Sequence, residues 1–169
     1  MPSPTPSEHS PERSQANPSA SGAPRTPRTT LPRTIARVVL GAFLLFAGTA
    51  HVTFARAEFQ AQVPTWLPLD ADFVVLASGV VEVLLGLALI VAWRWRVAVG
   101  FTVAAFFVAV FPGNISQYVT GTDAFGLDTD AARLIRLPFQ VLLIGLALWS
   151  TAAWRDRRSL LTPFQRRGA

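Results

Sequence analysis

The sequence contains no cysteine and no lysine, and charged residues make up only 15% of it. Without cysteine, the chain cannot form a disulfide, use a thiol nucleophile or hold an iron–sulfur cluster through thiolates. Its charged fraction is well below the roughly 25% that is usual for soluble domains. With 51% hydrophobic residues, a chain of 169 residues lacks the polar surface that a water-soluble fold needs.

The hydrophobic residues are concentrated in four runs, at residues 35–54, 73–93, 97–115 and 134–154. Each run has about the 20 residues that an α-helix needs to cross a bilayer. We therefore predict an all-α fold, a four-helix transmembrane bundle that occupies residues 33–155. Pro138 is expected in the first turn of the last helix, where its missing N–H matters little.

Both ends of the chain differ from this apolar middle. Residues 1–32 hold eight of the thirteen prolines and almost nothing apolar, so they cannot bury enough surface to offset their ordering entropy. We predict a disordered tail there, and a short basic tail at residues 156–169. Both tails are expected to be cytoplasmic.

The distribution of the fifteen arginines predicts the orientation. With four spans, twelve arginines fall on the side that both termini share, and only Arg56, Arg133 and Arg136 fall on the other. Basic residues accumulate on the cytoplasmic side, so we predict a multi-pass protein of the cytoplasmic membrane. Topology also accounts for the net charge of +5, and no nucleic-acid partner is expected. One alternative is that the first run is a secretory signal cleaved after Ala50, which would leave three spans.

Glycine spacing predicts how two of the helices pack. Gly41 and Gly48 are seven residues apart, and so are Gly79 and Gly86. Seven residues are two helical turns, so each pair lies on one face, where a neighbouring backbone can approach closely. We interpret these glycines as packing positions.

A few polar residues interrupt the apolar runs. Glu82 lies near the middle of the second run, where an ionisable side chain costs about 3 kcal/mol to insert. His51, Ser78, Asn114 and Gln140 also lie in the outer halves of their runs, so every helix contributes at least one. The uncharged polar residues of the inner halves, by contrast, are only Thr102, Ser150 and Thr151. This predicts a polar pocket that opens outward with Glu82 at its floor. The candidates are Glu82, His51, Ser78, Gln140, Asn114 and Arg136; no metal site is predicted, and no catalytic residue can be assigned.

Each candidate also has a purely structural interpretation. A protonated Glu82 could hydrogen-bond to Gln140, or to a carbonyl on a neighbouring helix, and lock the bundle. Gln140 could act as a link between helices. His51 could serve as a hydrogen-bonding residue at a helix end. Asn114 follows "FPG" and could simply end the third helix. For Arg136 we favour snorkelling to the headgroups over an interaction with Glu82.

Several short motifs resemble a known family. In order, "GTAHVTF", "QVPTWLP", "ASGVVEVLLGLAL", "VFPGNI" and "RLPFQVLLIGLA" are similar to the DoxX-like family of small bacterial membrane proteins, over residues 35–152. Val52 stands where relatives often have phenylalanine. The resemblance implies a four-helix membrane bundle linked to quinone-reducing and oxidative-stress systems. It places the family's characteristic positions at His51, Ser78, Gly79, Glu82, Pro112, Asn114, Arg136, Pro138 and Gln140.

Three functions remain open at this point, and so does the question whether the chain is an enzyme. The first is a quinone-linked membrane subunit of an oxidoreductase, in which Glu82 and His51 take up protons. The runs contain one histidine and no cysteine, so no covalently bound cofactor is expected and a redox partner protein would bring the electrons. The second is binding or proton-coupled transport of a small solute. The third is a scaffold subunit without chemistry. The oligomeric state cannot be inferred.

Overall fold

The computed structural model describes residues 29–160, which form four long helices and no strand. The long helices are α1 (Leu31–Val52), α3 (Ala71–Val91), α4 (Arg96–Thr120) and α5 (Asp130–Ser150). All four are long and apolar enough to cross a membrane, the third as the span Trp93–Thr120. This confirms the predicted all-α, four-span fold. The predicted tails lie mostly outside the described residues, although α1 already begins at Leu31.

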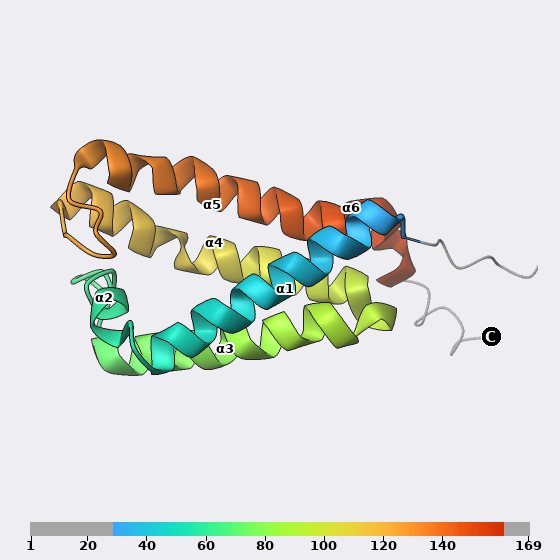
Figure 1. Cartoon of the computed structure of the whole chain (residues 1–169), viewed down its shortest axis with the longest axis horizontal. Helices are drawn as coiled ribbons and strands as arrows, with labels where there is room; N and C mark the ends of the chain where they lie inside the picture. Colours follow the sequence, from blue (N-terminus) through green and yellow to red (C-terminus); the bar gives the residue numbers. More distant parts are fainter. Residues whose placement is uncertain (1–28, 161–169) are drawn as a thin grey trace, which may run out of the picture.

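Four short elements connect or follow the spans. They are α2 (Arg56–Gln60), η1 (Trp93–Trp95), α6 (Ala153–Asp156) and η2 (Arg157–Leu160). The start of α1 and the end of η2 lie at the same end of the bundle (Figure 1). We call it the arginine-rich end, because it carries Arg33, Arg37, Arg94, Arg96, Arg155, Arg157 and Arg158. The opposite end, which carries α2 and the α4–α5 connection, is called the α2 end.

The tightest contact in the bundle joins α1 and α3 through the predicted glycines. A Cβ atom added to Gly48 would lie 2.6 Å from the carbonyl oxygen of Gly79, and one added to Gly41 would lie 2.8 Å from that of Gly86. No side chain fits at such distances, so the two backbones pack directly against each other. The packing role predicted for these glycines is confirmed.

The hydrophobic core lies in the half of the bundle nearer the arginine-rich end. All four long helices contribute to it. Its buried members are Leu40, Leu44, Leu89, Val103, Ala104, Phe107, Leu143 and Ala147. The half nearer the α2 end is packed less completely, and a cavity lies there.

Two helix boundaries differ from the prediction. The third span does not end near Asn114; α4 continues to Thr120, with Pro112 in its interior, and ends at Gly121, which has a φ of 64°. Pro138 is the ninth residue of α5 rather than part of its first turn. The reason is that the apolar runs show where the bilayer core lies, whereas caps decide where a helix ends. Both prolines therefore interrupt the backbone hydrogen bonds of helix interiors.

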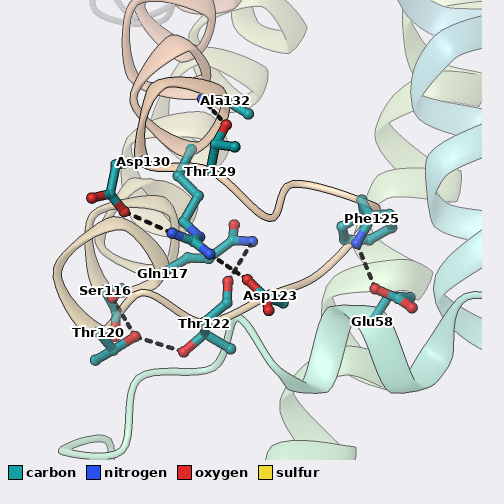
Figure 2. A network of polar contacts seen from close by, with 11 residues as sticks. Glu58, Ser116, Gln117, Thr120, Thr122, Asp123, Phe125, Thr129, Asp130 and Ala132 are labelled. Atoms are coloured by element: carbon teal, nitrogen blue, oxygen red, sulfur yellow. Dashed lines mark hydrogen bonds and ion pairs between the residues drawn. The ribbon is translucent and has the colours of Figure 1, made fainter.

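Polar contacts close the α2 end. Buried Arg133 of α5 forms ion pairs with Asp123 and Asp130. Figure 2 shows this network, in which Gln117 also donates to the carbonyl of Thr122 at 3.2 Å. In the same view, the backbone N–H of Phe125 donates to Glu58 of α2. These contacts tie α2 to the α4–α5 connection.

α2 is also tied to the start of α3. Arg56 pairs with Asp72, and the side-chain amide of Gln60 donates to the same carboxylate at 2.6 Å. The hydrogen bond to Asp72 raises the pKa of the Arg56 guanidinium, which is charged at any physiological pH. α2 is therefore held from both sides of the bundle.

One carboxylate serves two arginines at the arginine-rich end. Asp156 accepts from Arg96 at 2.6 Å and from Arg155 at 2.8 Å. Arg155, and to a lesser extent Arg96, hold the pKa of the Asp156 carboxyl below its usual value, so it is ionised at neutral pH. This pairing links α4 to the short helix that follows α5.

Candidate functional site

A cavity of about 420 Å³ lies in the half of the bundle nearer the α2 end. All six residues that the sequence singled out line it, together with Gln62, whose role the sequence did not reveal. They come from all four long helices: His51 from α1, Ser78 and Glu82 from α3, Asn114 from α4, and Arg136 and Gln140 from α5. The structure therefore brings the candidates together; that they form a functional site stays a prediction.

Glu82 and His51 form a buried acid–imidazole pair across the α1–α3 contact. The Oε2 atom of Glu82 lies 3.1 Å from Nδ1 of His51, and both residues are more than nine-tenths buried. Nδ1 also lies 2.9 Å from the carbonyl oxygen of Ala47. Because the carbonyl oxygen of Ala47 can only accept a hydrogen bond, Nδ1 is the ring nitrogen of His51 that donates.

The pair leaves one acceptor unsatisfied. The Nδ1–H of His51 is directed at Ala47, so Oε2 of Glu82 has a charge neighbour but no hydrogen-bond donor among residues 29–160. A buried carboxylate oxygen without a donor is destabilising by about 1–3 kcal/mol or more. Among residues 29–160, Glu82 forms no hydrogen bond with Gln140, which was one of the two partners that the structural interpretation allowed. Glu82 therefore lines the cavity with a carboxylate oxygen that receives no hydrogen bond from the described residues.

Gln140 and Asn114 form a second polar group in the cavity wall. Asn114 donates to the side-chain oxygen of Gln140 at 3.1 Å, and Gln140 donates to the backbone carbonyl of Phe107 at 2.8 Å. Gln140 thus links α4 and α5, as its structural interpretation proposed.

Arg136 points into the bundle, so the prediction that it snorkels to the headgroups was wrong. It donates to the side-chain oxygen of Gln117 at 2.7 Å, and its guanidinium lies 5.3 Å from the ring centre of Phe125. With its amide oxygen turned inward, Gln62 accepts from the same guanidinium at 2.6 Å. These partners, which come from α4 and two loops, were not visible in the sequence of α5 alone.

Phenylalanine rings form most of the remaining cavity wall. The ring of Phe59, from α2, stacks on His51 with centroids 3.3 Å apart, and Phe125 meets Phe59 edge-on at 4.6 Å. Sequence reasoning missed these residues because they lie in short connecting segments. The chain has twelve phenylalanines, but that number does not show which of them meet. Seven of them line this one cavity: Phe43, Phe46, Phe54, Phe59, Phe107, Phe125 and Phe139.

A second, smaller cavity of about 190 Å³ adjoins the first. It lies beneath the loop that follows α2, and His51, Phe59, Gln62 and Ser78 line both cavities. The hydroxyl of Ser78 donates to the carbonyl of Val75 in its own helix at 2.9 Å. His51 therefore has one cavity on the side of α5 and another on the side of the α2 end.

Among residues 29–160, no three histidine, aspartate or glutamate side chains are grouped as metal ligands would be. No curated protein and no solved structure matches the chain. A family model does match residues 40–151, and it is not that of the DoxX-like family, so the resemblance inferred from short motifs was wrong. Because the match covers more than half of the sequence, the chain belongs to the family described as "Domain of unknown function (DUF8561)".

Proposed function

We propose that the cavity binds a membrane-soluble quinone and its reduced quinol form, and that the chain is a quinone-linked subunit of a membrane oxidoreductase. The observation that carries the proposal is the unsatisfied Oε2 atom of Glu82, a buried acceptor that lines an aromatic cavity. A quinol hydroxyl is a donor of the kind that this oxygen lacks. When bound, the quinone–quinol pair supplies transfer of electrons coupled to protons.

The shape and lining of the cavity fit an aromatic ring with polar oxygens. About 420 Å³ accommodates a substituted single ring, and the phenylalanines offer faces and edges for stacking. Arg136 carries further N–H groups beside those given to Gln117 and Gln62, so it can donate to a second oxygen. The lining therefore offers an acceptor in Glu82 and a donor in Arg136.

The cavity also adjoins the surface that faces lipid. Phe46 of α1 and Phe54, in the turn that follows α1, line it; they are 66% and 74% exposed, and Phe139 of α5 is half exposed. A molecule dissolved in the bilayer can reach the cavity between α1 and α5 without crossing a polar surface. This favours a lipid-soluble ligand over the small water-soluble solute of the alternative hypothesis.

His51 and Glu82 are suited to hold and pass protons. Glu82 can take a proton from a hydroxyl at Oε2, and His51 lies within 3.1 Å of that atom. The smaller cavity beside His51 leads toward the α2 end, which gives the proton a route away from lipid. A partner protein must accept the electrons when the quinol is oxidised, or supply them when the quinone is reduced, because the spans contain no cysteine and one histidine.

We further propose that the arginine-rich end is cytoplasmic, as the excess of basic residues there indicates. Because the chain has no cysteine, single cysteines can be labelled one at a time. Arg94→Cys at the arginine-rich end should be blocked only by a thiol reagent that enters the cell, whereas Thr65→Cys at the α2 end should be blocked by an impermeant one. The reverse pattern would contradict the orientation.

Quinone binding is tested with the full chain in nanodiscs. Bound decyl-substituted benzoquinone is extracted and measured by chromatography, and we expect saturable binding by the wild type. Gln140→Leu removes the hydrogen bond to the Phe107 carbonyl and replaces a polar group in the cavity wall with an apolar one. We expect it to weaken quinone binding about tenfold. Thr49→Val on the exposed face of α1 is the matched control and should bind as the wild type does.

Three outcomes would contradict the proposal. One is that the wild type retains no more quinone than empty nanodiscs do. Another is proton-coupled uptake of a water-soluble solute into liposomes that is insensitive to the quinone, which would support the transport alternative. The third is that Gln140→Leu retains as much quinone as the wild type and Thr49→Val do, which would show that quinone partitions into the discs rather than into the cavity.

A further inference from the structure

Arg37 is a buried cation at the other end of the bundle, away from the quinone cavity. Its side chain belongs to α1 and is only 8% exposed. It makes no hydrogen bond and no ion pair with any residue in the range 29–160, and its Nη1 atom is buried without a partner. A buried guanidinium without an anion is strongly unfavourable, so an explanation for its retention is needed.

The charged groups around Arg37 are themselves mostly cations, so they do not neutralise it. Arg33 lies one turn earlier on the same face, and it too has a buried Nη1 atom without a partner in the described part of the chain. Arg96 of α4 is near enough for its charge to act on Arg37. The acidic residue described at this end is Asp156, and it is already shared between Arg96 and Arg155.

Aromatic packing fixes the position of Arg33. Its guanidinium lies 5.6 Å from the ring centre of Trp149 on α5, a cation–π contact that spans the gap between α1 and α5. Arg33 is the third residue of α1 and Arg37 the seventh, so their Cα atoms are about 6 Å apart along the helix axis. Arg33 therefore lies nearer the end of the bundle, and Arg37 lies one turn further in and is buried.

We propose that Arg33 and Arg37 form a binding site for the phosphate of an anionic phospholipid headgroup. Guanidinium groups bind phosphate through paired N–H donors, and a partly desolvated site strengthens such bonds. A headgroup phosphate at the end of the bundle where α1 begins would supply the anion that Arg33 and Arg37 do not find among residues 29–160. The inference is independent of the quinone cavity, because it rests on different residues.

The experiment compares the unfolding temperature of the full chain in two kinds of nanodisc, phosphatidylcholine alone and phosphatidylcholine with phosphatidylglycerol. Anionic lipid should raise the unfolding temperature of the wild type. Arg37→Gln should abolish that rise, and its apparent affinity for phosphatidylglycerol in a detergent titration should fall about tenfold. Arg94→Gln, which removes an equal charge from an exposed position at the same end, should keep the rise.

Folding of the variant is checked in the same data. In phosphatidylcholine alone, Arg37→Gln should unfold at the same temperature as the wild type or higher, because an unpaired buried charge has been removed. Arg37→Lys keeps the charge but loses the paired donors, so it should retain only part of the rise.

Three results would overturn the site. Arg37→Gln could respond to anionic lipid as the wild type does. Arg94→Gln could lose as much of the rise in unfolding temperature as Arg37→Gln does, which would mean that the lipid responds to surface charge in general and not to a site. Inorganic phosphate could stabilise the wild type equally in phosphatidylcholine discs, which would mean that the site takes a soluble anion and not a lipid.

Discussion

Replacing Gly79 with alanine is expected to destabilise the protein by about 3 kcal/mol, near the upper end of the usual cost of overpacking. The new Cβ would lie 2.7 Å from the Cβ of His51 and 3.0 Å from the carbonyl oxygen of Gly48. Neither atom can move away unless α1 shifts as a whole. Gly48→Ala should behave alike, since its Cβ would lie 2.6 Å from the carbonyl oxygen of Gly79.

The matched control is the same substitution in a helix that is open at that point. A Cβ on Gly145 of α5 would meet nothing within 4 Å, so Gly145→Ala should be neutral or stabilising by up to about 1 kcal/mol. Unfolding of the full chain in nanodiscs, followed by tryptophan fluorescence, measures all three variants. If Gly79→Ala and Gly145→Ala shift the transition equally, the close contact between α1 and α3 does not exist.

Replacing Glu82 with glutamine is expected to weaken binding of the quinol about tenfold or more and to change binding of the quinone by less than about threefold. A quinol hydroxyl donates to Oε2 of the carboxylate, and a hydrogen bond to a charged group is worth about 1.5–3 kcal/mol. The oxidised quinone has no such donor and gains nothing from the carboxylate. Binding of decyl-benzoquinol and decyl-benzoquinone in nanodiscs under anaerobic conditions measures the difference.

The same variant separates a ligand site from a structural lock. Glutamine has nearly the shape of glutamate, so Glu82→Gln should fold normally, and loss of the charge should not lower the unfolding temperature. If both ligand forms bind less tightly by the same factor and the protein is destabilised, Glu82 locks the bundle and the scaffold hypothesis gains support. Thr49→Val should leave the ratio of the two affinities unchanged.

The sequence revealed those cavity residues whose energetic cost can be judged without knowing their neighbours in the fold. Glu82, His51 and Gln140 could be identified because a polar side chain in an apolar run is expensive wherever it points. Their depth also placed them in the same half of the bundle. Phe59 and Phe125 could not be identified, because nothing in a short connecting segment shows that it folds back over the bundle.

Two errors have physical causes. Arg136 was expected at the headgroups because its partners, Gln117 and Gln62, lie far from it in the sequence. The family resemblance was wrong because strings such as "GVVEVLLGLAL" follow from constraints that unrelated membrane helices share: small residues for close packing and leucines for lipid. Short strings of this kind indicate membrane helices better than they indicate descent.

The direct backbone contact of Gly48 with Gly79 has a consequence for motion. His51 and Glu82 are carried by the two helices that this contact joins, so the distance between imidazole and carboxylate is held nearly constant. The opposite wall, α4 and α5, is interrupted by Pro112 and Pro138 and is the more deformable. The bundle thus divides into a stiff half that carries the acid–imidazole pair and a more deformable half, which under the proposed function would give way to an incoming quinone ring.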